Sequence, residues 1–147
     1  MIQVGVHIGS RRDLDVLKKH GIYTFQTLDP EISDPQMTGF AHFRLDSNLA
    51  NPKHIRYNVG LLQKTLDLCE KHQHQALVIH PGIRVGDLTE EQAKDVVLEV
   101  LYQVFSPVPI LVETDPGSKK GTRIGSLETC LDLIDKGIPG MGLCLDT

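Results

Sequence analysis

The 147-residue sequence has no tryptophan, and aromatic residues make up only 5% of it. A core must therefore be built mainly from leucine, isoleucine and valine, and the hydrophobic fraction of 40% is enough for one such core. No apolar run approaches the roughly 20 residues that span a bilayer, so no membrane segment is expected. The N-terminus begins on a strand-like pattern without the basic and long apolar regions of a secretory signal. We expect a cytoplasmic protein, or a nuclear or viral-factory protein in a eukaryotic or viral source.

The sequence also lacks paired cysteines and an excess of positive charge. Cys69, Cys130 and Cys144 are far apart and lie in apolar patterns, which indicates reduced core residues rather than disulfides. The formal net charge of −4 excludes a general basic field that would attract nucleic acid. Binding to nucleic acid would therefore need local basic patches or metal ions.

Short apolar runs alternate with amphipathic segments along the whole chain. Strands are predicted at residues 2–7, 22–28, 37–43, 76–79, 110–112 and 141–145. Helices are predicted to begin at Ser10, Asn51, Thr89 and Ser126, all residue types that cap helices, whereas the polar segment 29–36 lacks room for a helix. Strands that alternate with helices favour a parallel sheet. The expected fold is one α/β domain over 1–147, with about six parallel strands.

Two expectations concern which side chains face the core. In the helix that begins after Ser126, the apolar spacing predicts Leu127, Cys130, Leu131 and Ile134 as inward-facing. His72 and His74 lie at a helix end and are predicted to be surface residues without a metal.

Three predicted strands end on a potential metal ligand: His80, Glu113 and Asp146. Because the carboxyl ends of parallel strands open on one face, these side chains are expected to converge. Imidazole and carboxylate groups are ligands that zinc and similar cations prefer. His42 and His7 end two further strands. Each histidine alone is compatible with a buried hydrogen-bonded residue, but ligand types at so many strand ends favour a metal site.

The motifs at these strand ends resemble those of endonuclease IV, the family of zinc-dependent apurinic/apyrimidinic endonucleases. In family order they are Val4-Gly5-Val6-His7, His42 through Asn48-Leu49, Ile79-His80-Pro81-Gly82, Glu113-Thr114-Asp115-Pro116-Gly117 and Gly142-Leu143-Cys144-Leu145-Asp146-Thr147. The resemblance covers essentially this whole chain and the first two-thirds or so of a family domain. It implies a TIM barrel of the xylose-isomerase-like class, of which this chain is the N-terminal, incomplete portion.

The resemblance implies that His42, His80 and Glu113 bind one zinc ion. Glu113, the expected catalytic residue, would also bridge to a second zinc ion, for which Asp146 is a ligand. In the family, up to three zinc ions bind the phosphate 5′ to an abasic site in double-stranded DNA. A metal-held hydroxide then cleaves the phosphodiester, as a step of base excision repair. The complete domain is expected to be a monomer.

Five residues are predicted to contact DNA. His7 resembles the first-strand histidine of the family, which lines the site. Basic residues that follow strands are expected on the metal face, where they could contact phosphates or remain solvated: Arg11, Lys119, Lys120 and Arg123.

The sequence departs from the family pattern in three places. Residues 29–36 are too short for the usual helix and DNA-entering loop, Thr114 stands where many members have asparagine, and the later ligands of the family are absent from this sequence. Two alternatives therefore stay open: a single-metal sugar isomerase or epimerase of the xylose-isomerase-like barrels, and a non-catalytic remnant that pairs with another chain. The His-Pro-Gly motif and the loop with Lys119 and Lys120 favour DNA.

Overall fold

A single sheet of six parallel strands organises the computed structural model, which describes residues 6–115 and 122–146. The strands are β1 (Val6–Ile8), β2 (Thr24–Thr27), β3 (Thr38–His42), β4 (Leu77–Ile79), β5 (Ile110–Glu113) and β6 (Gly142–Cys144). They lie in the sheet in the same order as in the chain, and each pairs in parallel with the next. This order is the winding of a (β/α) barrel, whereas a doubly wound sheet reverses direction at its centre. The predicted parallel sheet is confirmed.

The helices begin where the sequence predicts. They are α1 (Arg11–Lys19), the 3-10 helix η1 (Pro52–His54) with α2 (Ile55–Lys71), α3 (Glu90–Leu101) and α4 (Leu127–Lys136). At the start of α3, the Thr89 hydroxyl accepts from the Gln92 N–H and the Gln92 side chain accepts from the Thr89 N–H. These two bonds form a capping box, which satisfies N–H groups that have no partner within the helix. Segment 29–36 contains no helix, as predicted. None of the helices in the described part of the chain has the length and hydrophobicity that a membrane-spanning segment needs.

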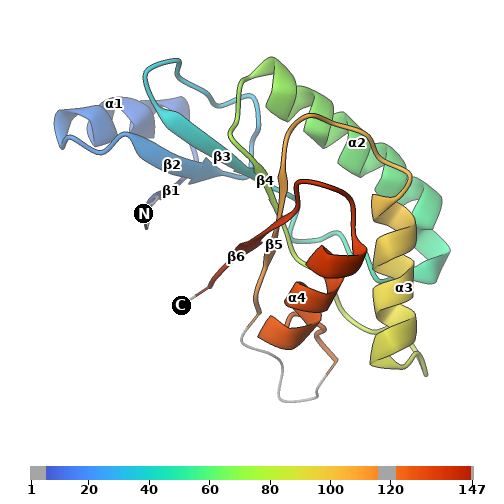
Figure 1. Ribbon diagram of the computed structural model, residues 1–147. Helices are drawn as coiled ribbons and strands as arrows, with labels where there is room; N and C mark the ends of the chain where they lie inside the picture. The colour runs from blue at the N-terminus through green and yellow to red at the C-terminus, as the bar shows by residue number, and fades with distance from the viewer. Residues whose placement is uncertain (1–5, 116–121, 147) are drawn as a thin grey trace.

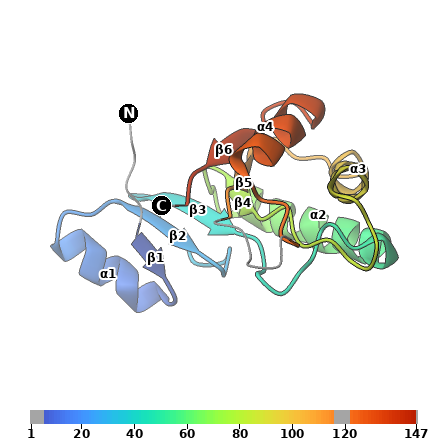
Figure 2. The ribbon, with the colours of Figure 1, turned by 90° about the horizontal axis from the view of Figure 1, so that it is seen from below.

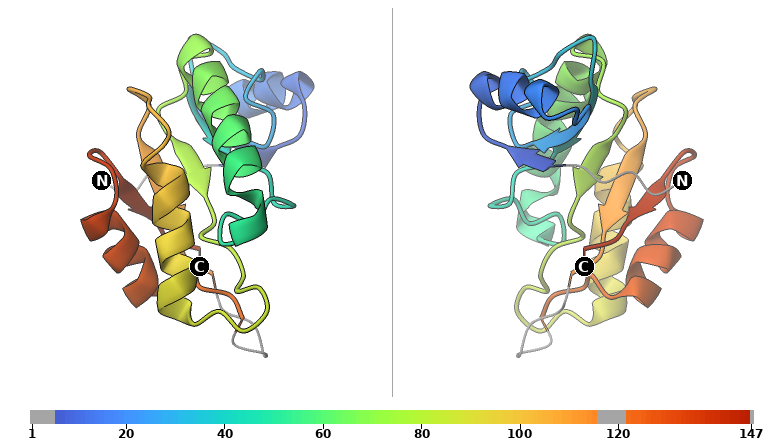
Figure 3. Two further views of the ribbon diagram at one scale, coloured as in Figure 1. Left: turned by 90° about the vertical axis from the view of Figure 1, so that its right-hand side faces the viewer. Right: turned by 90° about the vertical axis from the view of Figure 1, so that its left-hand side faces the viewer.

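The three longer helices cover one face of the sheet. Figure 3 shows α2, α3 and α4 side by side on this face, and the opposite view shows the strands in front of them. Figures 1 and 2 show α1 at the far end of the sheet, beside β1 and β2. The main core lies between the sheet and the helices and includes Leu62, Leu66, Ile79, Val97, Val112 and Leu133. A smaller cluster joins α1 to the first strands through Ile8, Leu14, Leu17, Phe25 and Ile32.

The predicted inward face of α4 is only partly correct. Cys130 is fully buried, but Leu127 and Leu131 are each 51% exposed. Leu133, which the pattern did not predict, is fully buried instead. The helix carries two adjacent apolar stripes, and the one with Cys130 and Leu133 faces the sheet.

The prediction of a surface position is wrong for His74, whose side chain is only 5% exposed. Its Nε2–H donates to the Pro30 carbonyl at 2.8 Å, and its ring lies edge-on to Phe25. The reason is the connection between β2 and β3, because segment 29–36 lies against His74 and supplies the Pro30 carbonyl that its ring binds.

Candidate metal centre

The alternation of side chains along each strand brings three potential ligands to one place. Ala41, Ile79 and Val112 point into the helix-covered core, and each is followed directly by a potential ligand. Because successive strand residues point to opposite faces, these ligands project from the other face of the sheet. They are His42 at the end of β3, His80 just after β4 and Glu113 at the end of β5.

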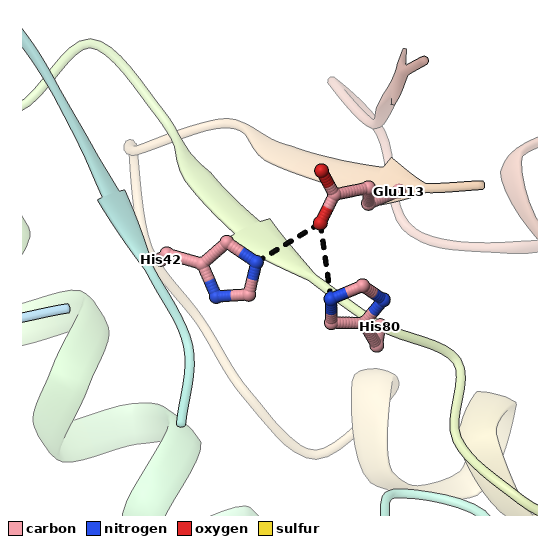
Figure 4. Close-up of side chains that lie close together, drawn as sticks. All are labelled: His42, His80 and Glu113. Atoms are coloured by element: carbon pink, nitrogen blue, oxygen red, sulfur yellow. Dashed lines mark hydrogen bonds and ion pairs between the residues drawn. The ribbon is translucent and has the colours of Figure 1, made fainter. Parts of the chain in front are cut away.

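The rings of His42 and His80 both point at one carboxylate oxygen of Glu113 (Figure 4). Oε2 of Glu113 lies 2.9 Å from Nε2 of His42 and 3.0 Å from Nε2 of His80. The potential ligand atoms of all three residues lie within 4.8 Å of one another. His42 is 6% exposed, Glu113 14% and His80 29%, so the group is largely shielded yet reachable from the His80 side.

The surroundings of His42 show what this group can bind. Nδ1 lies 2.6 Å from the Phe43 carbonyl while Nε2 faces Glu113, so each ring nitrogen meets an acceptor. Burial disfavours the imidazolium, but the hydrogen bonds to Glu113 and Phe43 outweigh it and raise the pKa of His42. Such a ring is satisfied either by two protons or by a cation at Nε2 and a proton at Nδ1. The donor set therefore fits a divalent metal ion of the zinc type.

His80 and Glu113 also have the protonation states that a metal ligand needs. Burial is the main cause that lowers the pKa of His80, which leaves this imidazole neutral as a ligand must be. Burial alone would raise the pKa of Glu113, but the hydrogen bond from His42 and the electrostatic interaction with the two neighbouring imidazoles lower it. Glu113 is therefore a carboxylate at neutral pH.

Cys144 is a contact of this centre that the sequence did not predict. It pairs with Glu113 in the β5–β6 register, and its Sγ lies 3.7 Å from Oε1, the carboxylate oxygen that the histidines leave free. Burial, together with the neighbouring Glu113, raises the pKa of Cys144 to about 11, so the thiol is a donor. The cysteine prediction thus holds for Cys69 and Cys130, which are buried, whereas Cys144 is only half-buried and lies at the centre.

Asp146 does not join the group of three within the described residues. It is exposed and follows β6, and its backbone N–H donates to the Thr114 hydroxyl at 3.0 Å. Its role as a ligand of a second ion therefore stays a prediction.

Three of the five predicted DNA-binding residues lie in the described part of the chain: His7, Arg11 and Arg123. His7 is exposed on β1 and lies outside the group of three. Arg11 donates to the Glu31 carbonyl at 3.0 Å, and Arg123 forms an ion pair with Asp115 at 2.5 Å. Lys119 and Lys120 lie outside the described residues.

A cavity of about 360 Å³ opens beside His80. Three loops line it, and the lining residues include Leu45, Asn48, Gly82, Ile83 and Arg123. Asn48 belongs to a motif quoted above, but nothing in the sequence indicated its contacts.

The sequence of the chain is similar to that of known proteins. No family model matches the chain. A probable endonuclease 4 from Thermotoga maritima is 32% identical to it over 127 residues, which are 82% of this chain and 40% of that protein. The chain thus spans about two fifths of the length of this curated relative.

Two solved structures share the fold. Endonuclease IV from Thermus thermophilus matches with a TM-score of 0.73 at 19% identity, over 99% of this chain and 62% of that one. A xylose isomerase domain protein from Planctomyces limnophilus matches with a TM-score of 0.59 at 14% identity, over 98% of this chain and 63% of that one. These similarities confirm the predicted barrel class of the fold.

Proposed function

Because the chain is related to the endonuclease IV family, we propose that it provides part of a zinc-dependent DNA repair endonuclease. The reaction would be hydrolysis of the phosphodiester 5′ to an abasic site in double-stranded DNA, as a step of base excision repair. The observation that carries this proposal is the convergence of His42, His80 and Glu113 from three successive strand ends onto one carboxylate oxygen.

In this function, His42 and His80 would hold a zinc ion through Nε2, and Glu113 through its carboxylate. A bound zinc ion supplies a hydroxide nucleophile at neutral pH and stabilises charge that develops on phosphate oxygens. The Phe43 carbonyl would keep the proton of His42 on Nδ1, so that Nε2 offers its lone pair. The Cys144 thiol would hold Oε1 of Glu113. Asp146 would serve a second ion that Glu113 also contacts.

DNA would approach this end of the sheet. Arg123 lies 46% exposed on the cavity wall, where its guanidinium could exchange Asp115 for a phosphate. We assign Arg11, Lys119 and Lys120 to the flanking phosphates and His7 to the rim of the site. Phosphate contacts of this kind position a duplex without reading its sequence.

The test combines zinc binding with cleavage of a duplex that carries one abasic site. We expect the wild-type chain to bind zinc and His80→Ala to lose it, because the variant removes one of three ligands. His20→Ala is the control, since His20 is an exposed histidine at the end of α1. A wild-type chain that binds no zinc would refute the metal centre. Zinc binding without cleavage would refute nuclease activity of this chain alone and support an incomplete enzyme.

A single-metal sugar isomerase is the second candidate, because three ligands can hold one ion and the fold matches a xylose isomerase domain protein. The curated relative of higher identity favours the nuclease. Aldose–ketose conversion by the zinc-, magnesium- or manganese-loaded chain, with no cleavage of abasic DNA, would reverse this preference.

A further inference from the structure

His80 differs from His42 in how its ring is held. The Nδ1 atom of His42 is fixed by the Phe43 carbonyl, whereas the buried Nδ1 atom of His80 has no hydrogen-bond partner in the described part of the chain. Metal-binding histidines are commonly oriented by a partner on the second ring nitrogen. Apart from its contacts with Glu113 and the His42 ring, the His80 side chain is therefore oriented by the backbone that carries it, which continues into the loop at residues 81–84.

Asn48 holds that loop with its side-chain amide. Its Oδ1 accepts from the Ile83 N–H at 2.9 Å, and its Nδ2 donates to the Ile83 carbonyl at 2.8 Å. Both backbone polar groups of Ile83 are thus bound by one side chain, as a neighbouring strand would bind them. Oδ1 also accepts from the Ala50 N–H at 3.1 Å, which fixes the amide within its own loop.

Packing around the amide leaves little freedom. Gly82 has a φ of +110°, and a Cβ atom there would lie 2.3 Å from Oδ1 of Asn48. Only glycine adopts this conformation without strain while the amide stays in place. On the inner side, the carbonyl of Asn48 accepts from Nδ2 of Asn58 at 2.8 Å, and Asn58 is 1% exposed. Asn48 therefore connects α2 to the loop that carries His80.

We propose that Asn48 is the positioning residue of the metal centre: its amide sets where His80 presents Nε2 to the ion that His42 and Glu113 share. This inference rests on the proposed function, because it requires His80 to be a ligand. Asn48 contacts no ligand atom of the group of three, so its effect would pass through residues 82 and 83.

The experiment measures cobalt(II) binding and the visible spectrum of the bound cobalt in Asn48→Ala. Loss of the amide removes both bonds to Ile83, while the backbone bonds of residues 82 and 84 to residues 124 and 122 remain. We expect affinity to fall about 10-fold, the lower end of the range for side chains that bond directly to a metal ligand. The cobalt spectrum should change as well, because the ligand geometry around the ion becomes less uniform.

Asn51→Ala is the matched control. Asn51 is an asparagine of the same loop whose side-chain hydrogen bonds go to the Lys53 N–H at 3.0 Å and to Nδ1 of His54 at 3.2 Å, both at the start of the following helix. The Asn51→Ala variant should be less stable than the wild-type chain, with the same cobalt affinity and the same cobalt spectrum. If Asn48→Ala fails to fold, Asn48→Asp serves instead, since it keeps the accepting oxygen and replaces the donor to Ile83 with a carboxylate oxygen that repels the Ile83 carbonyl.

The possible results distinguish a failure of the positioning role of Asn48 from a failure of the proposed metal site. A wild-type chain without a cobalt site overturns both. A wild-type chain that binds cobalt through His80, beside an Asn48 variant with unchanged affinity and spectrum, overturns the positioning role alone. Equal losses in Asn48→Ala and Asn51→Ala would also overturn it, because the effect would then be general loop stability.

Discussion

One oxygen atom, Oε2 of Glu113, faces both histidines of the candidate centre. This carboxylate favours a proton on His42 and raises its pKa, whereas burial lowers the pKa of His80. The two imidazoles therefore differ in how readily they take up a proton, although they are expected to bind the same ion. Wherever His42 is protonated, zinc would have to displace that proton.

This difference predicts how zinc affinity depends on pH. The pKa of His42 is raised above its ordinary value of 6.5, so the proton competes with zinc at and above that pH. We expect the affinity to fall about tenfold for each pH unit below the raised pKa, and to level off above it. The measurement is a competition titration with a chelator at a series of pH values.

The number of protons released per zinc gives an internal control. One proton per ion should be released where His42 is protonated, and none well above its pKa, as read from binding heats in two buffers. An affinity that stays constant through this range would contradict the assignment of the proton to His42.

Strand β3 needs a glycine at position 39, where two buried side chains lie close to the backbone. A Cβ atom at Gly39 would lie 2.7 Å from Cζ of Phe25 and 2.9 Å from Nδ1 of His74, and both side chains are buried. Neither can move away freely, so Gly39→Ala should destabilise the fold by about 1–3 kcal/mol. Urea unfolding measures this change.

Gly60→Ala is the matched control for that substitution. Gly60 lies on the exposed side of α2, and a Cβ atom there meets nothing within 4 Å. The same change should stabilise the chain by about 0.5–1 kcal/mol, because alanine is the better helix former. Equal effects at the two positions would show that the contacts of Gly39 do not matter.

The elements themselves follow closely from the sequence. Caps at Ser10, Thr89 and Ser126 and short apolar runs are local signals, and the structure has a helix or strand at each. The positions of three potential ligands follow from the same signals, because a polar residue at the end of a buried run lies at a strand end. The contacts of Asn48 could not be predicted, since they join residues 35 positions apart through a loop without a periodic pattern.

The two wrong predictions, a surface position for His74 and the inward stripe of α4, have a similar cause. His74 looks like a surface residue because its neighbours are polar, yet segment 29–36 covers it from a distant part of the chain. On α4, Leu127 and Leu131 form as good an apolar stripe as Cys130 and Leu133. Helical spacing shows that such stripes exist, but only the packing of the sheet decides which of them is buried.

The strand β6 and the helix α4 leave apolar surface uncovered. All three residues of β6 are only half-buried, and within the described residues β6 pairs with β5 alone. Leu127 and Leu131 are exposed on the neighbouring α4. An unpaired strand edge beside exposed leucines is a typical site of association between chains.

We therefore expect the isolated chain to self-associate at high concentration through α4. The double substitution Leu127→Gln, Leu131→Gln should weaken this association and change the free energy of unfolding by less than about 0.5 kcal/mol, because both side chains are already half in solvent. Leu133→Gln, in the fully buried stripe of the same helix, should instead destabilise the fold by about 2–5 kcal/mol. Sedimentation velocity over a range of concentrations measures the first effect and urea unfolding the second. Association that persists in the double variant would exclude α4 and leave the edge of β6 as the contact.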